Sequence, residues 1–211
     1  MAYDLQEQEQ IASLKAWWDK YGNFIFTVAT VALLAVAAWN GWTWYQRKQA
    51  VEAAAVYEEL LKAIEAKDAA RIKPAAAKLV ESYGRTVYAP LAALAAAKTA
   101  HETKDGTTAK AQLKWVVEQS RHPEFAAIAR VRLAGVLLDE KAYDEALQVL
   151  SAEVAPAQRV AVADRRGDVL FAQGKLDEAR KAYQQALDLA EPGHPLRGLV
   201  QLKLDALPAA S

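Results

Sequence analysis

The residues best suited to acid–base or metal chemistry in this sequence are three histidines and two acidic pairs, and neither set forms a recognisable site. The histidines have no partners at metal-ligand spacing, and His101-Glu102 lacks the second histidine that a zinc-protease helix would place four residues later. The acidic pairs stand where helices are expected to begin, because the helix dipole stabilises negative charge there. The sequence therefore predicts no catalytic centre, no cofactor and no metal, and the histidines are expected in loops or at helix ends. The histidines are His101, His122 and His194, and the pairs are Asp144-Glu145 and Asp177-Glu178.

Composition removes further classes of chemistry. The chain has no cysteine, which excludes disulfides, thiolate zinc sites and cysteine nucleophiles. It contains neither a phosphate-binding glycine loop nor a Gly-x-Ser-x-Gly elbow. The 26 basic residues balance the 26 acidic ones, so no general electrostatic attraction for nucleic acid exists, and none is expected as a partner. The abundance of alanine is typical of closely packed helices.

Residues 21–46 form an uncharged, largely apolar stretch that predicts a transmembrane helix. The 26 residues would extend about 39 Å as a helix, against about 30 Å of hydrocarbon. Both ends carry aromatic side chains of the kind that gather at headgroup level. A soluble core helix would explain neither the length nor the two aromatic belts. The predicted interface residues are Trp17, Trp18 and Tyr21 on one side, and Trp39, Trp42, Trp44 and Tyr45 on the other.

The sequence leaves processing and orientation open. A cleaved signal peptide is the alternative, because Ala35-Val36-Ala37 offers a small-x-small site, but the preceding segment is acidic rather than basic. Lys15 and Lys20 on one flank match Arg47 and Lys48 on the other, so the positive-inside rule gives no orientation. The predicted organisation is a tail over 1–20, a span over 21–46 and a helical domain over 47–211.

The helical domain shows an internal repeat. Apolar residues recur at helical spacing, and Gly and Pro divide the chain into segments of about 10 to 20 residues, which predicts an all-α fold of stacked helical hairpins. Blocks around Leu137, Ala146 and Leu150 recur 33 residues later. The second copy resembles a tetratricopeptide repeat, in which small residues let two helices approach and large ones fill the space between neighbours. The predicted packing residues are Ala134, Leu137, Ala146, Gly167, Leu170, Gly174, Ala179, Tyr183 and Ala186.

Two further segments complete the predicted solenoid. A fainter copy lies 37 residues earlier, with its extra residues expected in a loop near His122-Pro123; it comprises Ala97, Ala100, Ala109 and Leu113. Residues 196–207 carry several polar side chains and predict a capping helix, since terminal repeats need a polar outer face.

Tetratricopeptide domains commonly bind peptides on the concave face formed by the first helix of each hairpin. The repeat register places Val131, Leu138, Asp164, Asp168 and Phe171 on that face. An apolar groove with acidic spots is predicted, and a clamp for a terminal carboxylate is disfavoured because the expected Lys and Asn are missing. Val131, Leu138 and Phe171 either contact a partner or simply pack between repeats. Charge-swapping Asp168 and truncating Phe171 are expected to weaken capture without unfolding.

The order of parts resembles the YfgM family over nearly the whole chain. The specific pieces are Trp17-Trp18 followed by Tyr21-Gly22, and the block Tyr83-Gly84-Arg85-Thr86-Val87-Tyr88-Ala89. The resemblance implies a bitopic protein of the Gram-negative inner membrane, with a cytoplasmic tail and a periplasmic repeat domain. It also implies association with the SecYEG translocon and with the chaperone PpiD, possible contact with exported polypeptides, and no catalytic residues. An envelope scaffold without client binding is the alternative, and an enzyme is a third.

Overall fold

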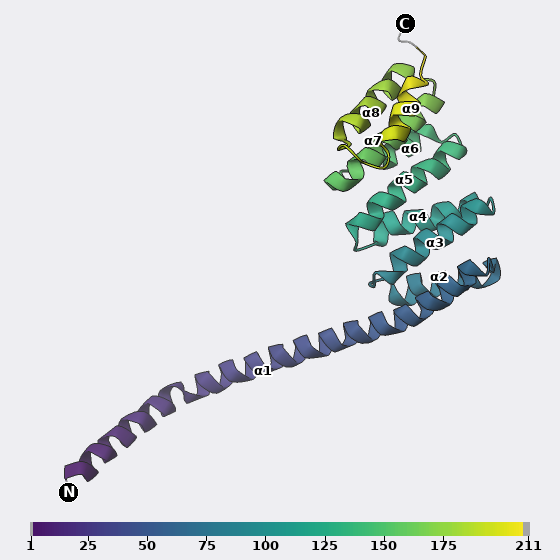
Figure 1. The fold of residues 1–211 in the computed structure, drawn as a ribbon. Coiled ribbons are helices and arrows are strands. Elements are labelled where there is room, and N and C mark those ends of the chain that lie inside the picture. The colour runs from purple at the N-terminus through teal and green to yellow at the C-terminus, as the bar shows by residue number, and fades with distance from the viewer. Residues whose placement is uncertain (1, 209–211) are drawn as a thin grey trace. The chain divides into compact units, whose positions relative to one another are not determined.

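The computed structural model describes residues 2–208, and the all-α class expected from the sequence is confirmed: the described residues form helices joined by short turns (Figure 1). The chain divides into two units, the first ending at Gln49 and the second beginning at Ala50. The helices are α1 (Ala2–Glu65), α2 (Ala69–Tyr83), α3 (Tyr88–Glu102), α4 (Gly106–Gln119), α5 (Pro123–Asp139), α6 (Tyr143–Val149), α7 (Pro156–Ala172), α8 (Leu176–Leu189) and α9 (Arg197–Asp205).

Helix α1 contains the membrane-spanning candidate. Among the described residues it is the one helix long and apolar enough to cross a bilayer, with a mean hydropathy of 1.8 in its most apolar window. Only 6% of that window is buried within the protein. A core helix of a soluble protein would be mostly covered, so the structure does not fit that alternative. Lipid is the environment that suits exposed Phe24, Leu33 and Leu34.

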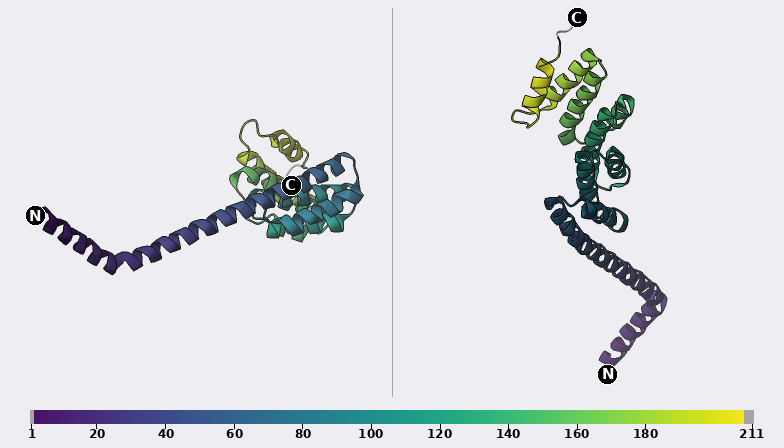
Figure 2. Two further views of the ribbon diagram at one scale, coloured as in Figure 1. Left: turned by 90° about the horizontal axis from the view of Figure 1, so that it is seen from below. Right: turned by 90° about the vertical axis from the view of Figure 1, so that its right-hand side faces the viewer.

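The second unit is a stack of four helical hairpins, visible from two further directions in Figure 2. Residues 50–65 of α1 pair with α2, and the pairs α3–α4, α5–α6 and α7–α8 follow. Each pair is joined by a three-residue turn whose middle residue has a positive φ, at Lys67, Lys104, Lys141 and Gly174. The residue after it donates its N–H to a carbonyl five residues earlier, as Asp105 does to Ala100 at 2.7 Å. The hairpins are thus copies of one local structure.

Local sequence explains where the helices begin. Asp68 caps α2 by accepting the backbone N–H groups of Ala70 and Arg71, and Asp105 caps α4 by accepting that of Thr108 at 3.0 Å. Helices α5 and α7 begin with Pro123 and Pro156, where the missing N–H costs nothing.

Three apolar clusters hold the hairpins together. The first joins the end of α1 to α2 and α3 around Leu60 and Leu79. The second joins α3 through α6 around Leu113, Leu133 and Leu137, and the third packs α7, α8 and α9 around Tyr183. Many members are alanines, which lets the helices approach closely.

The Tyr83-to-Ala89 block connects the first hairpin to the second. Tyr83 donates its hydroxyl hydrogen to Glu52 at 3.4 Å, and the rings of Tyr57 and Tyr88 lie 5.4 Å apart. The hydroxyl of Thr86 donates to the carbonyl of Tyr83 at 2.8 Å, in the turn that leads into α3. The block therefore has a packing role, setting how α3 follows α2.

The predicted third repeat copy corresponds to the hairpin α3–α4, but its extra residues do not lie in a loop. Only residues 120–122 separate α4 from α5. The added length lies in α4, which has 14 residues where its counterpart α6 has 7. The expected loop near His122-Pro123 was therefore wrong, because a helix absorbs an insertion without exposing new backbone groups.

Candidate functional site

A cavity of about 460 Å³ opens where the first helices of three successive hairpins, α3, α5 and α7, face a common groove. Four lining residues are apolar and five can carry charge, with a glycine between them. The lining residues are Ala97, Lys98, His101, Leu113, Arg132, Gly135, Val136, Leu138, Asp139 and Arg165. The cavity thus combines apolar contact area with fixed charges, as binding sites commonly do.

Repeat register explains why these residues meet. Lys98, Gly135 and Asp168 occupy equivalent places, 37 and 33 residues apart, on α3, α5 and α7. Arg132 and Arg165 are also equivalent, because they are 33 residues apart. Arg132 lies one turn before Val136, and Arg165 lies one turn before Val169. Stacking the hairpins therefore brings side chains from three repeats to one groove.

The two arginines are only partly engaged within the domain. Arg132 donates from Nη1 to the carbonyl of Leu94 at 3.4 Å. Nη1 of Arg165 pairs with a carboxylate oxygen of Asp168 at 3.3 Å, while its buried Nε has no hydrogen-bond partner among the described residues. Since a guanidinium has five N–H donors, both groups retain hydrogen-bonding capacity toward the groove.

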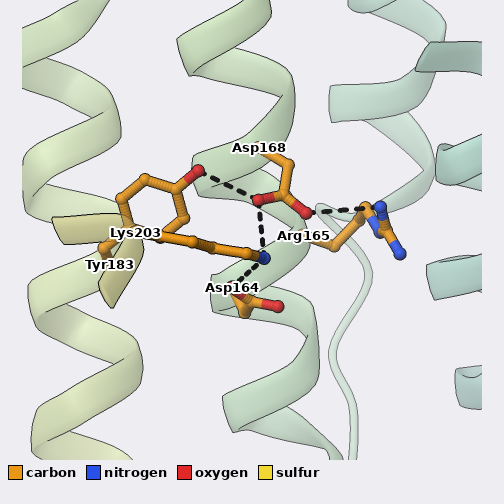
Figure 3. A network of polar contacts seen from close by, with 5 residues as sticks. All are labelled: Asp164, Arg165, Asp168, Tyr183 and Lys203. Atoms are coloured by element: carbon orange, nitrogen blue, oxygen red, sulfur yellow. Dashed lines mark hydrogen bonds and ion pairs between the residues drawn. The ribbon is translucent and has the colours of Figure 1, made fainter. Parts of the chain in front are cut away.

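The acidic residues predicted for the groove are occupied within the domain (Figure 3). Nζ of Lys203, on α9, lies 2.7 Å from a carboxylate oxygen of Asp164 and 2.7 Å from one of Asp168. Asp164 is buried, with 8% of its surface exposed. The two carboxylates therefore hold the C-terminal helix against α7 and do not present free negative charge to a partner. The expectation of acidic spots is corrected accordingly.

Tyr183 completes this network. Its hydroxyl donates to Asp168 at 2.9 Å, and its ring fills the space beside Gly167. Burial, and then the neighbouring carboxylate of Asp168, raise the pKa of Tyr183 above the usual range for tyrosine. A charge swap at Asp168 would break three contacts at once, so it cannot serve as a mutation that leaves the fold intact.

The three apolar residues predicted for the groove lie in different settings. Leu138 lines the cavity and is half-buried. Val131 is also half-buried and packs against the second cluster, which is the packing alternative that the sequence left open. Phe171 is 49% exposed near the C-terminal end of α7. Only Leu138 among them borders the cavity.

The nine residues predicted to pack the repeats lie at helix contacts or turns. Eight of them are buried; the exception is Gly174, which has a φ of +79° in the turn between α7 and α8. A Cβ on Gly167 would lie 2.4 Å from the Tyr183 ring, which explains the glycine there. The buried residues are Ala134, Leu137, Ala146, Gly167, Leu170, Ala179, Tyr183 and Ala186.

The predicted interface aromatics are all exposed along α1, and their ring contacts are with neighbours on the same helix. Rings of Trp17 and Tyr21 lie 5.7 Å apart, and Trp18 lies edge-on to Phe26 at 5.6 Å. The Trp18 indole covers Gly22, where a Cβ would lie 3.1 Å from it. The exposed set is Trp17, Trp18, Tyr21, Trp39, Trp42, Trp44 and Tyr45. This arrangement leaves the rings free to contact headgroups.

Two of the histidines lie at helix ends, and His194 lies in the loop between α8 and α9. His101 is in the last turn of α3, 3.9 Å from Asp139; His122 caps α5; and Nδ1 of His194 accepts the N–H of Leu196. Within residues 2–208, no group of three or more His, Asp or Glu is placed to hold a metal ion.

Sequence reasoning missed the basic side of the groove, comprising Lys98, Arg132 and Arg165. The usual groove positions of a tetratricopeptide repeat fall on Val131 and Asp164. Arg132 and Arg165 each follow one of these positions by one residue. The shared 33-residue offset of the two arginines was the available signal. Their approach to one cavity depends on the stacking of the hairpins and was not visible in either repeat alone.

The stacked hairpins and their groove define a tetratricopeptide repeat-like protein. The family model for a tetratricopeptide repeat-like domain matches residues 15–209, nearly the whole chain.

Curated relatives narrow this class to a particular family. A protein from Neisseria gonorrhoeae named ancillary SecYEG translocon subunit is 34% identical over 211 residues, covering 98% of this chain and 100% of the relative. Proteins of the same name from Aggregatibacter actinomycetemcomitans and Escherichia coli are 32% and 25% identical, covering 98% and 95% of this chain and 100% and 96% of the relatives. The chain belongs to the YfgM family, whose members include these ancillary SecYEG translocon subunits.

Proposed function

We propose that this chain is a single-pass protein of the bacterial inner membrane whose hairpin domain binds other proteins beside the SecYEG translocon. The observation that carries the proposal is the full-length similarity to relatives named ancillary SecYEG translocon subunit. The exposed apolar part of α1 supports the membrane anchor, and the groove across α3, α5 and α7 supports protein binding.

The proposed topology places residues 1–20 in the cytoplasm, 21–46 in the bilayer and 47–211 in the periplasm. Aromatic side chains at both ends of the span support these boundaries. Flanking charge does not select an orientation, so the direction rests on resemblance to the YfgM family.

The proposed partners are the translocon itself, a membrane-anchored periplasmic chaperone of the PpiD kind, and exported polypeptides. Anchoring the domain to the bilayer would raise the effective concentration of its groove for proteins that emerge nearby. Weak individual contacts would then be enough for function. No catalytic step is part of this proposal.

Photocrosslinking in native membranes tests the proposal. A photoreactive amino acid replaces Leu33, which is 71% exposed in the span, or Phe171, which is 49% exposed on the domain. We expect translocon adducts from the span, and chaperone or nascent-chain adducts from Phe171. The matched control is Leu60, which is fully buried in the first hairpin and should give none. Fixed adducts to other envelope complexes, with none to the translocon, would instead identify a scaffold.

The absence of native cysteine allows a clean test of topology. Single variants Ser13→Cys and Ser151→Cys place a thiol at exposed positions in the tail and in the turn after α6. A membrane-impermeant maleimide should label Ser151→Cys in intact spheroplasts and Ser13→Cys only after lysis. The reverse pattern would contradict the orientation, and a mature N-terminus at Ala38 would contradict the anchor.

A further inference from the structure

We infer that the cavity between α3, α5 and α7 is a receptor for an acidic segment of a bound polypeptide. The inference deepens the proposed protein-binding function and rests on it. Among the lining residues, Lys98, Arg132 and Arg165 are cationic and Asp139 is the one carboxylate. Glu102 and Asp168 pair with Lys98 and Arg165 from outside the lining, so the lining itself carries more positive than negative side chains.

The state of the arginines supports a carboxylate ligand. Arg165 lies against the backbone of Gly135, whose missing side chain leaves the guanidinium uncovered: a Cβ there would be 3.7 Å from its Cζ. Arg165 pairs with Asp168 through Nη1 at 3.3 Å, and the hydrogen bond of Arg132 to the carbonyl of Leu94 is long, at 3.4 Å, so each guanidinium keeps other N–H groups for a ligand. Guanidinium groups with spare donors bind carboxylates by paired, charge-assisted hydrogen bonds.

The distribution of charge favours a segment over a single terminal carboxylate. The three cations come from three successive hairpins, so they follow the groove rather than surround one point. Leu113, Val136 and Leu138 supply apolar surface at the same cavity. The ligand that matches both features is a polypeptide segment that carries both acidic and apolar residues.

The test measures binding of a short fluorophore-labelled peptide to the full-length chain in nanodiscs of neutral lipid. The peptide alternates Glu with Leu and has both ends blocked, and the matched peptide carries Gln in place of every Glu. We expect the Glu peptide to bind at least about tenfold more tightly, which corresponds to about 1.4 kcal/mol. Its affinity should fall as salt is raised from low to physiological concentration.

Variants of the cavity locate the site. Arg132→Gln, and Gly135→Leu, which fills the space beside Arg165, should each weaken binding of the Glu peptide about tenfold or more. The matched control is Arg166→Gln, at an exposed arginine next to Arg165, which should bind as wild type does. Lys98→Gln, at a largely exposed side chain, gives a second charge variant that leaves the core untouched.

Several results would overturn the inference. Equal binding of the Glu and Gln peptides would show that charge is not recognised. Binding that requires a free C-terminus would indicate a terminal carboxylate, and displacement by vesicles of phosphatidylglycerol would indicate a lipid headgroup. Unchanged binding in Arg132→Gln and Gly135→Leu, with native helix content by circular dichroism, would place the ligand elsewhere. None of these results affects translocon crosslinking from Leu33, so the two proposals fail separately.

Discussion

The ring of Tyr183 occupies the space where a side chain on Gly167 would lie, with Cε1 2.4 Å from the position of a Cβ. Gly167→Ala must therefore displace a buried ring whose hydroxyl is fixed to Asp168. Overpacking costs about 1–3 kcal/mol, and the better helix propensity of Ala offsets about 1 kcal/mol. We expect a net loss of about 1 kcal/mol in urea unfolding. Gly135→Ala, on the equivalent helix of the previous hairpin, is the control and should be neutral or stabilising.

Lys203 connects α9 to α7 through two carboxylates. Lys203→Met leaves Asp164 and Asp168 without their shared cation in a largely buried place, and we expect a loss of about 2–3 kcal/mol. Hydrogen exchange should show α9 opening first, while α3 and α4 remain protected. The exposed Lys181→Met on α8 is the matched control. Equal protection of α9 in both variants would show that Lys203 does not hold the helix.

The raised pKa of Tyr183 predicts that the folded protein loses stability at alkaline pH. Its pKa in the folded protein is raised above the unfolded value of about 10. The stabilisation is therefore complete below about pH 10, and it is lost as pH rises from there toward the folded-state pKa. Wild type should lose stability more steeply above pH 10 than Tyr183→Phe does. Parallel curves of stability against pH for the two proteins would contradict the role given to Tyr183. Lysines titrate in both proteins, so their effect cancels in the comparison.

The repeated turns predict opposite effects at equivalent positions. Lys141 has a φ of 58° and Gly174 a φ of 79°, both in the left-handed region. Lys141→Gly should stabilise the domain by about 0.5–1 kcal/mol, because glycine adopts this conformation without steric cost. Gly174→Ala should destabilise it by about 1 kcal/mol. Thermal unfolding of the two variants measures both changes in stability. Changes of the same sign in the two variants would contradict the prediction.

The sequence was sufficient for features that depend on local pattern. Gly167, Ala179 and Tyr183 follow the spacing of one hairpin, and the tryptophan clusters mark the ends of an uncharged stretch. These signals led to the helical class, the membrane helix and the last two hairpins, together with a weaker indication of the one before them.

The first hairpin and the charge network escaped sequence reasoning for physical reasons. Helix α1 continues from the apolar stretch to Glu65 without Gly or Pro, so nothing marked residues 50–65 as the beginning of a repeat. The Lys-Asp pairs at 67–68 and 104–105, 37 residues apart, were the available clue. Lys203 and Asp164 are 39 residues apart, and only packing of α9 reveals that they meet.

The shared turn of the four hairpins has a consequence for how the domain acquires its structure. Each turn closes through bonds spanning only a few residues, and the side-chain hydrogen bonds described within residues 2–208 join positions at most 39 apart. A chain emerging from a narrow tunnel N-terminus first can therefore complete one layer after another, each new layer forming on a finished template. Helix α9 arrives last and, through Lys203, closes the exposed end of the stack.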